Sequence, residues 1–119
     1  MYLYPNRVLE NRDWVATADV RIIDALAEDG VELFPTSDDA VLSLALPERG
    51  VDCELRVRSA HGRETMRLRF FLGDTLVAVH IVVAPIIWTV VRLTVGAWDS
   101  VEITANRLVD LDFLRAGMP

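Results

Sequence analysis

The side chains best suited to covalent or metal chemistry in this sequence are one cysteine and two histidines, Cys53, His61 and His80. Nucleophilic catalysis needs a nucleophile, a base and an orienting group that converge in space. Cys53 falls on the apolar face of an alternating segment, which predicts a buried and inert thiol. Neither histidine has a cysteine or a second histidine at zinc-ligand spacing. We therefore predict that the protein is not an enzyme.

Acidic side chains provide the next candidates. Asp110 and Asp112 alternate with apolar residues near the end of the chain, so both carboxylates should point to one side of a strand. Two such groups could contribute to a calcium site, which takes six to eight oxygen ligands. Protection of an edge strand by charge is the favoured interpretation of the pair. We predict no cofactor, with calcium at Asp112 as the alternative.

Trp88 and Trp98 are the aromatic candidates. Trp88 alternates with a predicted inward-facing set, which places it on the opposite face of its strand, and Trp98 stands beside Asp99 in a predicted turn over 96–100. Exposed aromatic rings stack on sugars or anchor protein interfaces. We therefore predict carbohydrate or partner contact through Trp88, Trp98 and Asp99. The competing interpretation is that each ring closes an edge of the fold or lies beneath a loop.

The composition limits the protein class. A chain of 119 residues, 52% of them hydrophobic, fits one domain with a core of its own. A net charge of −6 would repel phosphate backbones, so nucleic acid is not a predicted partner. The single cysteine excludes an intrachain disulfide. The longest apolar stretch, residues 76–91, contains His80 and Pro85 and falls short of the ~20 residues of a membrane helix, so no membrane span is predicted.

Alternation of apolar and polar residues predicts that strands make up most of the chain. A strand over 14–22 has a helix beginning after Asp13 as its alternative, and a short helical turn could follow near residues 24–29. Pro47 should stop one strand and Gly96 should begin a turn after another. The predicted strands cover segments 42–46, 51–57, 66–72, 75–81, 87–95, 101–103 and a last one near 108–114. Seven to eight short strands predict an all-β fold, an antiparallel two-sheet jelly-roll sandwich.

Two hairpins set the expected register. Gly73-Asp74 predicts a two-residue hairpin that pairs Phe70 with Val77 and places His80 on the outer face, opposite Arg67.

A four-residue loop over 59–62 would pair Asp52 with Arg69 and Glu54 with Arg67, because opposite charges across strands are stabilising. The four arginines of these two strands, Arg56, Arg58, Arg67 and Arg69, are therefore interpreted as one salt-bridged outer face.

Residues 1–13 form a predicted extended N-terminal arm ahead of a single β-sandwich domain, 14–119. The first residues contain no apolar signal core, so secretion is not predicted. Tyr2, Leu3 and Tyr4 are the expected anchors of this arm on a neighbouring subunit.

From about Ala40 to Leu114 the chain resembles the galactose-binding-like jelly rolls, especially carbohydrate-binding modules. The resemblance rests on four segments, namely Glu54-Leu55-Arg56-Val57-Arg58, the hairpin tip Gly73-Asp74, the strand Ile87-Trp88-Thr89-Val90 and the closing strand Val109-Asp110-Leu111-Asp112-Phe113. It implies a structural calcium held by Asp112 and sugar stacking by Trp98, and less directly by Trp88. The paired N-terminal glutamates that usually complete the calcium site in that group are not evident.

Two functional hypotheses follow. The first is a non-catalytic structural protein of a virion, such as a capsid decoration, head–tail or tail accessory protein. It would form a homo-oligomer within a larger assembly and would be located in a virion or in the cytoplasm. The alternative is a carbohydrate-binding module that recognises glycans through exposed tryptophan. The sequence favours the first hypothesis, because it lacks a predicted secretion signal.

Overall fold

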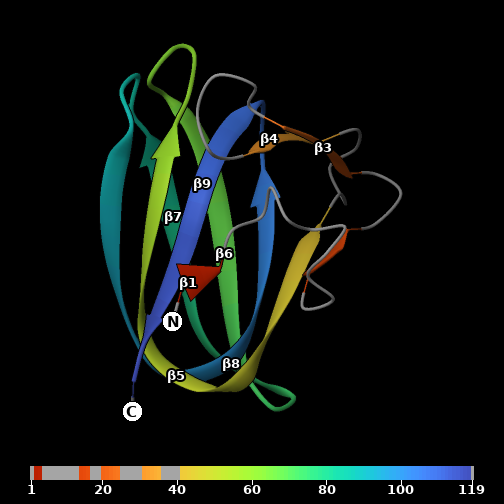
Figure 1. Ribbon diagram of the computed structural model, residues 1–119, viewed down its shortest axis with the longest axis vertical. Coiled ribbons are helices and arrows are strands. Elements are labelled where there is room, and N and C mark those ends of the chain that lie inside the picture. Colours follow the sequence, from red (N-terminus) through yellow and green to blue (C-terminus); the bar gives the residue numbers. More distant parts are fainter. Residues whose placement is uncertain (1, 4–13, 17–19, 25–30, 36–40, 119) are drawn as a thin grey trace.

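The computed structural model describes residues 2–3, 14–16, 20–24, 31–35 and 41–118. Within these ranges the chain forms nine strands and contains no helix, so nothing there could cross a membrane as a helix. The strands, labelled in Figure 1, are β1 (Tyr2–Leu3), β2 (Trp14–Ala16), β3 (Val20–Asp24), β4 (Val31–Pro35), β5 (Leu42–Arg58), β6 (Glu64–Leu72), β7 (Thr75–Ala84), β8 (Thr89–Ala105) and β9 (Val109–Gly117).

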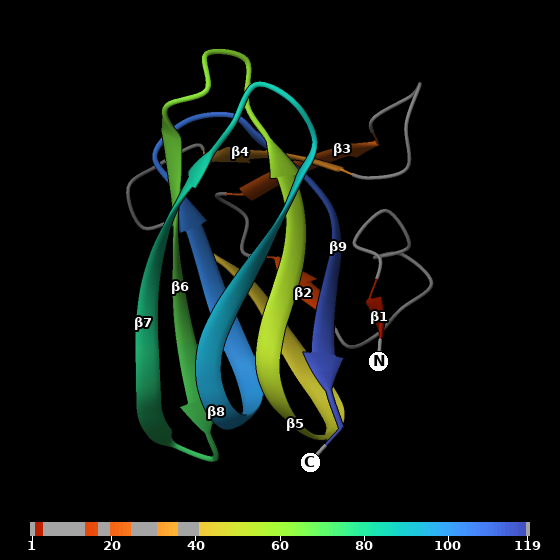
Figure 2. The same ribbon diagram turned by 90° about the vertical axis from the view of Figure 1, so that its left-hand side faces the viewer.

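All strand pairs are antiparallel and follow the order β3-β4-β9-β5-β8-β6-β7, with β1 beside β9 and β2 beside β5. The long strands β5 and β8 bend, and at this bend the hydrogen-bonded sheet turns back on itself and forms two layers, as Figures 1 and 2 show. The first layer contains β9, β4 and β3 with the second half of β5 and the first half of β8. The second layer contains β6 and β7 with the other halves of β5 and β8. This arrangement confirms the predicted all-β antiparallel fold and is consistent with a sandwich, although the described residues form nine strands in one continuous hydrogen-bonded path, where seven to eight strands in two sheets were predicted.

Two predicted strand ends are wrong, because β5 and β8 continue through the bend. Pro47 does not stop a strand, because β5 continues through it by register shifts between Ala45 and Gly50 and between Val51 and Cys53. An interrupted ladder tolerates a proline that has no N–H to donate. The predicted turn over 96–100 is likewise part of β8.

The side chain of Asp52 on β5 links the bend of β5 to the bend of β8 by hydrogen bonds. Its backbone has a positive φ of 53°, and Gly96 on the opposite strand has a φ of 80°. One carboxylate oxygen of Asp52 accepts hydrogen bonds from the backbone N–H groups of Val95 and Gly96, both at 2.9 Å. These two bonds, that of Gly96 first, lower the pKa of the Asp52 carboxyl. Asp52 and Gly96 therefore bend the neighbouring strands β5 and β8 at the same point. This shared bend divides one continuous sheet into two layers that face each other.

The core lies between the layers and is built from the inward-facing residues of the alternating strands. Phe70 of β6 meets the Trp98 ring edge-on, with ring centroids 5.0 Å apart. Val91, Leu93 and Val95 of β8 pack against this core, as their alternation predicted. Ile87, which belongs to the same predicted inward set, is 74% exposed and precedes β8, so its predicted orientation is wrong. The fully buried side chains of largest volume are Trp98, Phe70, Leu42, Leu44, Leu55, Met66, Leu68, Ile103, Leu111, Leu114 and Val57.

The β6–β7 hairpin turns at Gly73-Asp74 as predicted, but its register shifts by one residue. Leu72 pairs with Thr75, whereas Phe70 pairs with Ala78 because Val77 forms a bulge. A one-residue slip moves every later side chain to the other face. The predicted outer position of His80 is therefore wrong: it pairs with Leu68, and its Nε2 lies 3.0 Å from the Thr94 carbonyl oxygen of the facing layer.

The predicted pairing of β5 with β6 is also wrong. β5 pairs with β2, β8 and β9, and β6 pairs with β7 and β8, so the loop after β5 crosses from one layer to the other. The backbone N–H of Ser59 donates to the Pro85 carbonyl oxygen at 2.7 Å, which fixes this crossing. Glu54 and Arg69 therefore find partners other than those predicted, because charge matching between sequence neighbours could not identify strands from the far end of the chain.

The crossing loop contains a buried carboxylate. Glu64 Oε1 lies 2.8 Å from His61 Nδ1, and the Glu64 side chain is only 5% exposed. Hydrogen bonds from Ser59 first, then from His61 and the backbone of the loop, lower the pKa of Glu64 to about 2. The loop therefore depends on the ionised form of Glu64.

Glu64→Gln is expected to lower the free energy of unfolding at neutral pH, with an effect that depends on pH. Because the folded-state pKa lies below the ordinary value of 4.5, the stabilisation is complete above about 4.5 and is lost as the pH falls towards about 2. Urea midpoints of the wild type and the variant should therefore converge over that range. The exposed Glu48→Gln serves as control and should change little at any pH. A Glu64→Gln effect that is constant from pH 7 to pH 2 would contradict this interpretation.

Several predictions concern residues 1–29. The strand predicted over 14–22 corresponds to β2 and β3, with residues 17–19 outside the described residues. Residue 24 ends β3, and the rest of the predicted helical turn lies outside the described residues. Tyr2 and Leu3 form β1 and pair with Arg115 and Leu114 of the same chain, whereas Tyr4 lies outside the described residues. Contact of these three residues with another subunit stays a prediction.

Candidate functional site

A row of charged side chains lies on the outer face of the first layer. Along β5, Cys53, Leu55 and Val57 are buried, and the residues between them, Glu54, Arg56 and Arg58, point away from the core. Their partners come from the neighbouring strands β8 and β9. We call this surface the charged face; it comprises Glu54, Arg56, Arg58, Trp88, Arg92, Asp110, Asp112 and Arg115.

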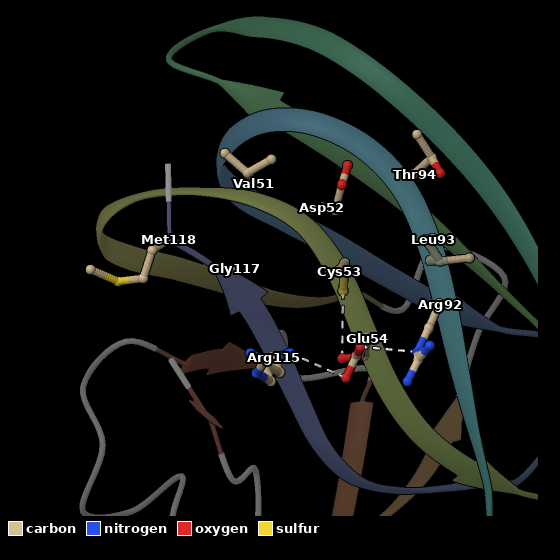
Figure 3. A pocket seen from close by; sticks show the side chains of 10 residues that line it. All are labelled: Val51, Asp52, Cys53, Glu54, Arg92, Leu93, Thr94, Arg115, Gly117 and Met118. Atoms are coloured by element: carbon tan, nitrogen blue, oxygen red, sulfur yellow. Dashed lines mark hydrogen bonds and ion pairs between the residues drawn. The ribbon is translucent and has the colours of Figure 1, made fainter.

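At one end of the charged face Glu54 joins three strands. Its Oε1 lies 3.1 Å from Arg92 Nε on β8, and its Oε2 lies 3.4 Å from Arg115 Nη1 on β9. Figure 3 shows Glu54 between these two guanidinium groups. The Arg92 side chain is 81% exposed, so most of its hydrogen-bond donors face solvent. This end can offer both acceptors and donors to a polar ligand.

An open groove of about 420 Å³ lies at this end, beside the bend. Its volume is within the range of about 300–1,000 Å³ typical of ligand sites. Asp52 and Glu54 supply two negative charges and Arg92 and Arg115 supply two positive charges, so the formal charge of the lining cancels. The remaining lining residues, drawn in Figure 3, are Val51, Cys53, Leu93, Thr94, Gly117 and Met118. A neutral ligand with many hydroxyl groups fits such a lining, because hydroxyls both donate and accept.

The other end of the charged face is built around Trp88. The guanidinium carbons of Arg56 and Arg58 both lie 4.5 Å from the centre of the indole ring. Arg56 also pairs with Asp112 at 2.8 Å, and Arg58 pairs with Asp110 at 2.7 Å. Trp88 is half-buried, so the structure places it on the predicted outer face but in contact with arginines of its own chain. A sugar could stack on this ring only where the arginines leave it uncovered.

Two polar atoms of this cluster are unsatisfied. Trp88 Nε1 and Asp112 Oδ1 are buried and have no hydrogen-bond partner among the described residues. Buried polar groups are paired in the great majority of cases, so such atoms need an explanation. One is a hydrogen-bond donor and the other is an acceptor.

Asp110 and Asp112 do not protect an edge strand. β9 lies between β5 on one side and β4 and β1 on the other, which makes it an internal strand. Each carboxylate is paired with an arginine, and the described residues contain no group of three or more acidic, histidine or cysteine side chains that could hold a metal ion. Calcium at Asp112 stays a prediction, now with Arg56 as a competitor for the same carboxylate.

The expected exposure of Trp98 is wrong. The ring is fully buried where β8 bends, and its Nε1 donates to the Asp52 carbonyl oxygen at 2.9 Å. Trp98 is therefore a core residue that cannot stack on a sugar in this conformation. Asp99, its predicted companion, accepts from the backbone N–H of Gly73 at 3.0 and 3.1 Å and so fastens the β6–β7 turn to β8. Contact of either residue with a ligand stays a prediction that the geometry does not favour.

Cys53 confirms the predicted buried thiol. It is 2% exposed, and burial raises the pKa of its thiol to about 12. Only the thiolate reacts with electrophiles.

We therefore expect a colorimetric disulfide reagent at pH 8 to modify Cys53 slowly in the native protein and rapidly in guanidinium chloride. Equal rates in the two conditions would mean that the groove beside Cys53 opens far enough to expose sulfur.

The residues that line the open groove were not predicted as a site. Glu54 and Arg92 were interpreted as parts of alternating strands, and Arg115 lay just beyond the last predicted strand. Only the fold reveals that three separate strands bring them together. No local pattern marks such a site, because its members are far apart in sequence.

No family model matches the sequence, and no curated protein matches it. Solved structures do share its fold. The module CsCBM6-3 from Clostridium stercorarium in complex with cellobiose has a TM-score of 0.64 at 9% identity and covers 100% of this chain and 94% of its own. The module CBM6cm-2 from Cellvibrio mixtus lichenase 5A in complex with cellotriose has a TM-score of 0.55 at 15% identity, covering 100% and 97%.

A family two carbohydrate esterase from Cellvibrio japonicus has a TM-score of 0.67 at 12% identity; the match covers 99% of this chain and 33% of the enzyme. At these identities the likeness establishes the fold, which is the β-sandwich of carbohydrate-binding modules. It confirms the predicted resemblance. The two modules contradict the favoured hypothesis of a virion structural protein and support the alternative, because both are carbohydrate-binding modules.

Proposed function

We propose that this β-sandwich is a non-catalytic module that binds carbohydrate at the open groove of the charged face. The observation that carries the proposal is the groove lining, in which Glu54 holds the exposed Arg92 and the half-exposed Arg115 at one rim. Ionised side chains form hydrogen bonds roughly twice as strong as neutral ones, and a sugar presents several hydroxyls at once. The fold, shared with modules solved in complex with cellobiose and cellotriose, supports the same conclusion.

The charge of the groove selects among carbohydrates. Because two acidic and two basic side chains cancel, neither acidic nor basic sugars gain net attraction there. The overall charge of −6 repels polyanionic glycans at long range. The proposed ligand is therefore a neutral oligosaccharide, with Met118 and Leu93 providing apolar contact for a sugar ring. Trp88, at the other end of the charged face, is a further contact point for a longer chain.

A glycan array tests this proposal if it carries neutral and acidic glycans, including cellobiose, cellotriose and xylohexaose. We expect retention on neutral oligosaccharides, and a strong reduction by Glu54→Gln, which keeps the shape of the side chain but releases both arginines. Retention on no glycan at all would contradict carbohydrate binding. Retention that Glu54→Gln leaves unchanged would contradict the groove as the site.

A further inference from the structure

An apolar stripe runs along the outer side of β7. The bulge at Val77 turns the odd-numbered residues of the strand outward, and they are β-branched aliphatic side chains. Ile81 is 70% exposed and Val83 is 54% exposed. Leu76, Ile86 and Ile87 extend this exposed apolar surface at its two ends. We call Val77, Val79, Ile81 and Val83 the apolar stripe.

β7 is also an open edge. Among the described residues it pairs only with β6, and it is the last strand of the hydrogen-bonded path. The first half of β8, in the facing layer, likewise pairs only with β5 within the part of the chain that the structure describes. Figure 2 views the molecule from this side, where β7 and the first half of β8 are the nearest strands of their layers. A row of unpaired backbone groups thus borders the apolar stripe.

The usual protection of an edge strand is absent from this segment. Natural edge strands carry charged residues or proline, which prevent pairing with another chain. From Thr75 to Val91 the sequence contains no aspartate, glutamate, lysine or arginine, and its one proline, Pro85, lies just after β7. The bulge at Val77 affects only the end near the turn. A regular, uncharged stretch of strand remains from Ala78 to Ala84.

We propose that β7 is the interface of a two-fold symmetric dimer, in which β7 of one copy pairs antiparallel with β7 of a second copy. Two molecules of charge −6 repel one another, and this uncharged segment lets them meet without opposing like charges. In an antiparallel pair of identical strands, the numbers of any two residues that lie opposite each other add up to the same sum. Opposite residues point to the same face of the sheet, so both numbers are odd or both are even, and the sum is even. Outward residues therefore meet only outward residues, so every outer cross-strand pair joins two aliphatic side chains.

The strand therefore complements itself in direction, charge and side-chain pattern. A different protein would need an equally uncharged strand with an apolar outer face to pair with β7. A second copy of this chain already carries such a strand. The dimer also merges the second layers of two copies into one sheet, which removes the exposed edge. Its formation is independent of the groove, which lies on the first layer.

Light scattering of the full chain, from micromolar to millimolar concentration, tests the dimer. We expect a mass that rises to that of two chains, and we expect Ile81→Arg to weaken association by about tenfold or more, because it places a positive charge in the apolar stripe of both copies. Ile81 is exposed, so the variant should fold. Ala60→Arg, which adds the same charge on an exposed loop, should dimerise as the wild type does. A wild type that is monomeric throughout, or an Ile81→Arg dimer of unchanged strength, would overturn the proposal.

Cross-linking tests the symmetry itself. Single cysteine variants at the four stripe positions, oxidised alone and in pairwise mixtures, should cross-link only in combinations whose residue numbers share one even sum. Native Cys53 is buried and should not contribute. Two outcomes would show that the copies meet elsewhere. One is cross-links in combinations whose residue numbers give different sums, and the other is a dimer that forms no cross-link at any of the four positions.

Discussion

Trp98→Ala is expected to lower the free energy of unfolding by about 3–5 kcal/mol, the largest stability effect of any substitution considered for this protein. The ring is fully buried at the bend of β8 and contacts Phe70 edge-on. Removing it leaves a cavity and also removes the donor to the Asp52 carbonyl oxygen. Domains of this size are stable by only about 5–15 kcal/mol, so the variant should lose a large part of its stability. Urea unfolding followed by circular dichroism measures the loss.

Trp98→Phe keeps this prediction testable if the alanine variant does not fold. It retains a ring in the core but cannot donate to Asp52, so an intermediate loss is expected. Trp88→Ala is the matched control, because Trp88 is half-buried on the outer face and its loss should cost less than that of Trp98. If Trp98→Ala is no more destabilising than Trp88→Ala, Trp98 does not hold the bend together.

Arg92→Ala is expected to weaken sugar binding by about tenfold to a hundredfold. Hydrogen bonds that involve a charged group contribute about 1.5–3 kcal/mol, and each 1.4 kcal/mol corresponds to a tenfold change in Kd. The variant should remain folded, because its ion pair with Glu54 is exposed and such pairs contribute little to stability. Isothermal titration with cellotriose, the sugar bound in one structural neighbour, and with xylohexaose measures the change.

Arg69→Ala is the control for this prediction. Arg69 forms an ion pair of the same kind with Glu102, at 3.4 Å, but on the outer face of the second layer. Its removal should leave sugar affinity unchanged. Equal weakening by both variants would mean that the loss reflects general charge and not contact in the groove.

The sequence predicted the class of fold because alternation along each strand depends only on neighbouring residues. Buried Cys53, Leu55 and Val57 and the turn at Gly73-Asp74 all follow from such local patterns. The ends of β5 and β8 could not be predicted, because Pro47 and Gly96 normally end strands. Here the side chain of Asp52 bridges to the opposite strand and holds both through a bend.

The register of β7 and the groove were beyond sequence reasoning for another reason. A single bulge at Val77 reverses which residues face outward, and no local signal distinguishes a bulged hairpin from a regular one. The false pairing of β5 with β6 arose because Glu54 and Arg67 match in charge. The true partners of Glu54, Arg92 and Arg115, come from β8 and β9. Such long-range partners depend on topology, which alternation does not encode.

Backbone amide chemical shifts, recorded while cellotriose or xylohexaose is added to isotope-labelled protein, test the central claim most directly. Carbohydrate binding in the groove predicts saturable shifts at residues 51–54, 92–94 and 115–118, with little change at Thr65, Arg67 and Thr104, which line a smaller depression on the second layer. Trp88 should shift with the longer sugar if the binding surface extends along β5. Shifts confined to the second layer, or no shifts at millimolar concentration of either sugar, would contradict the proposed site.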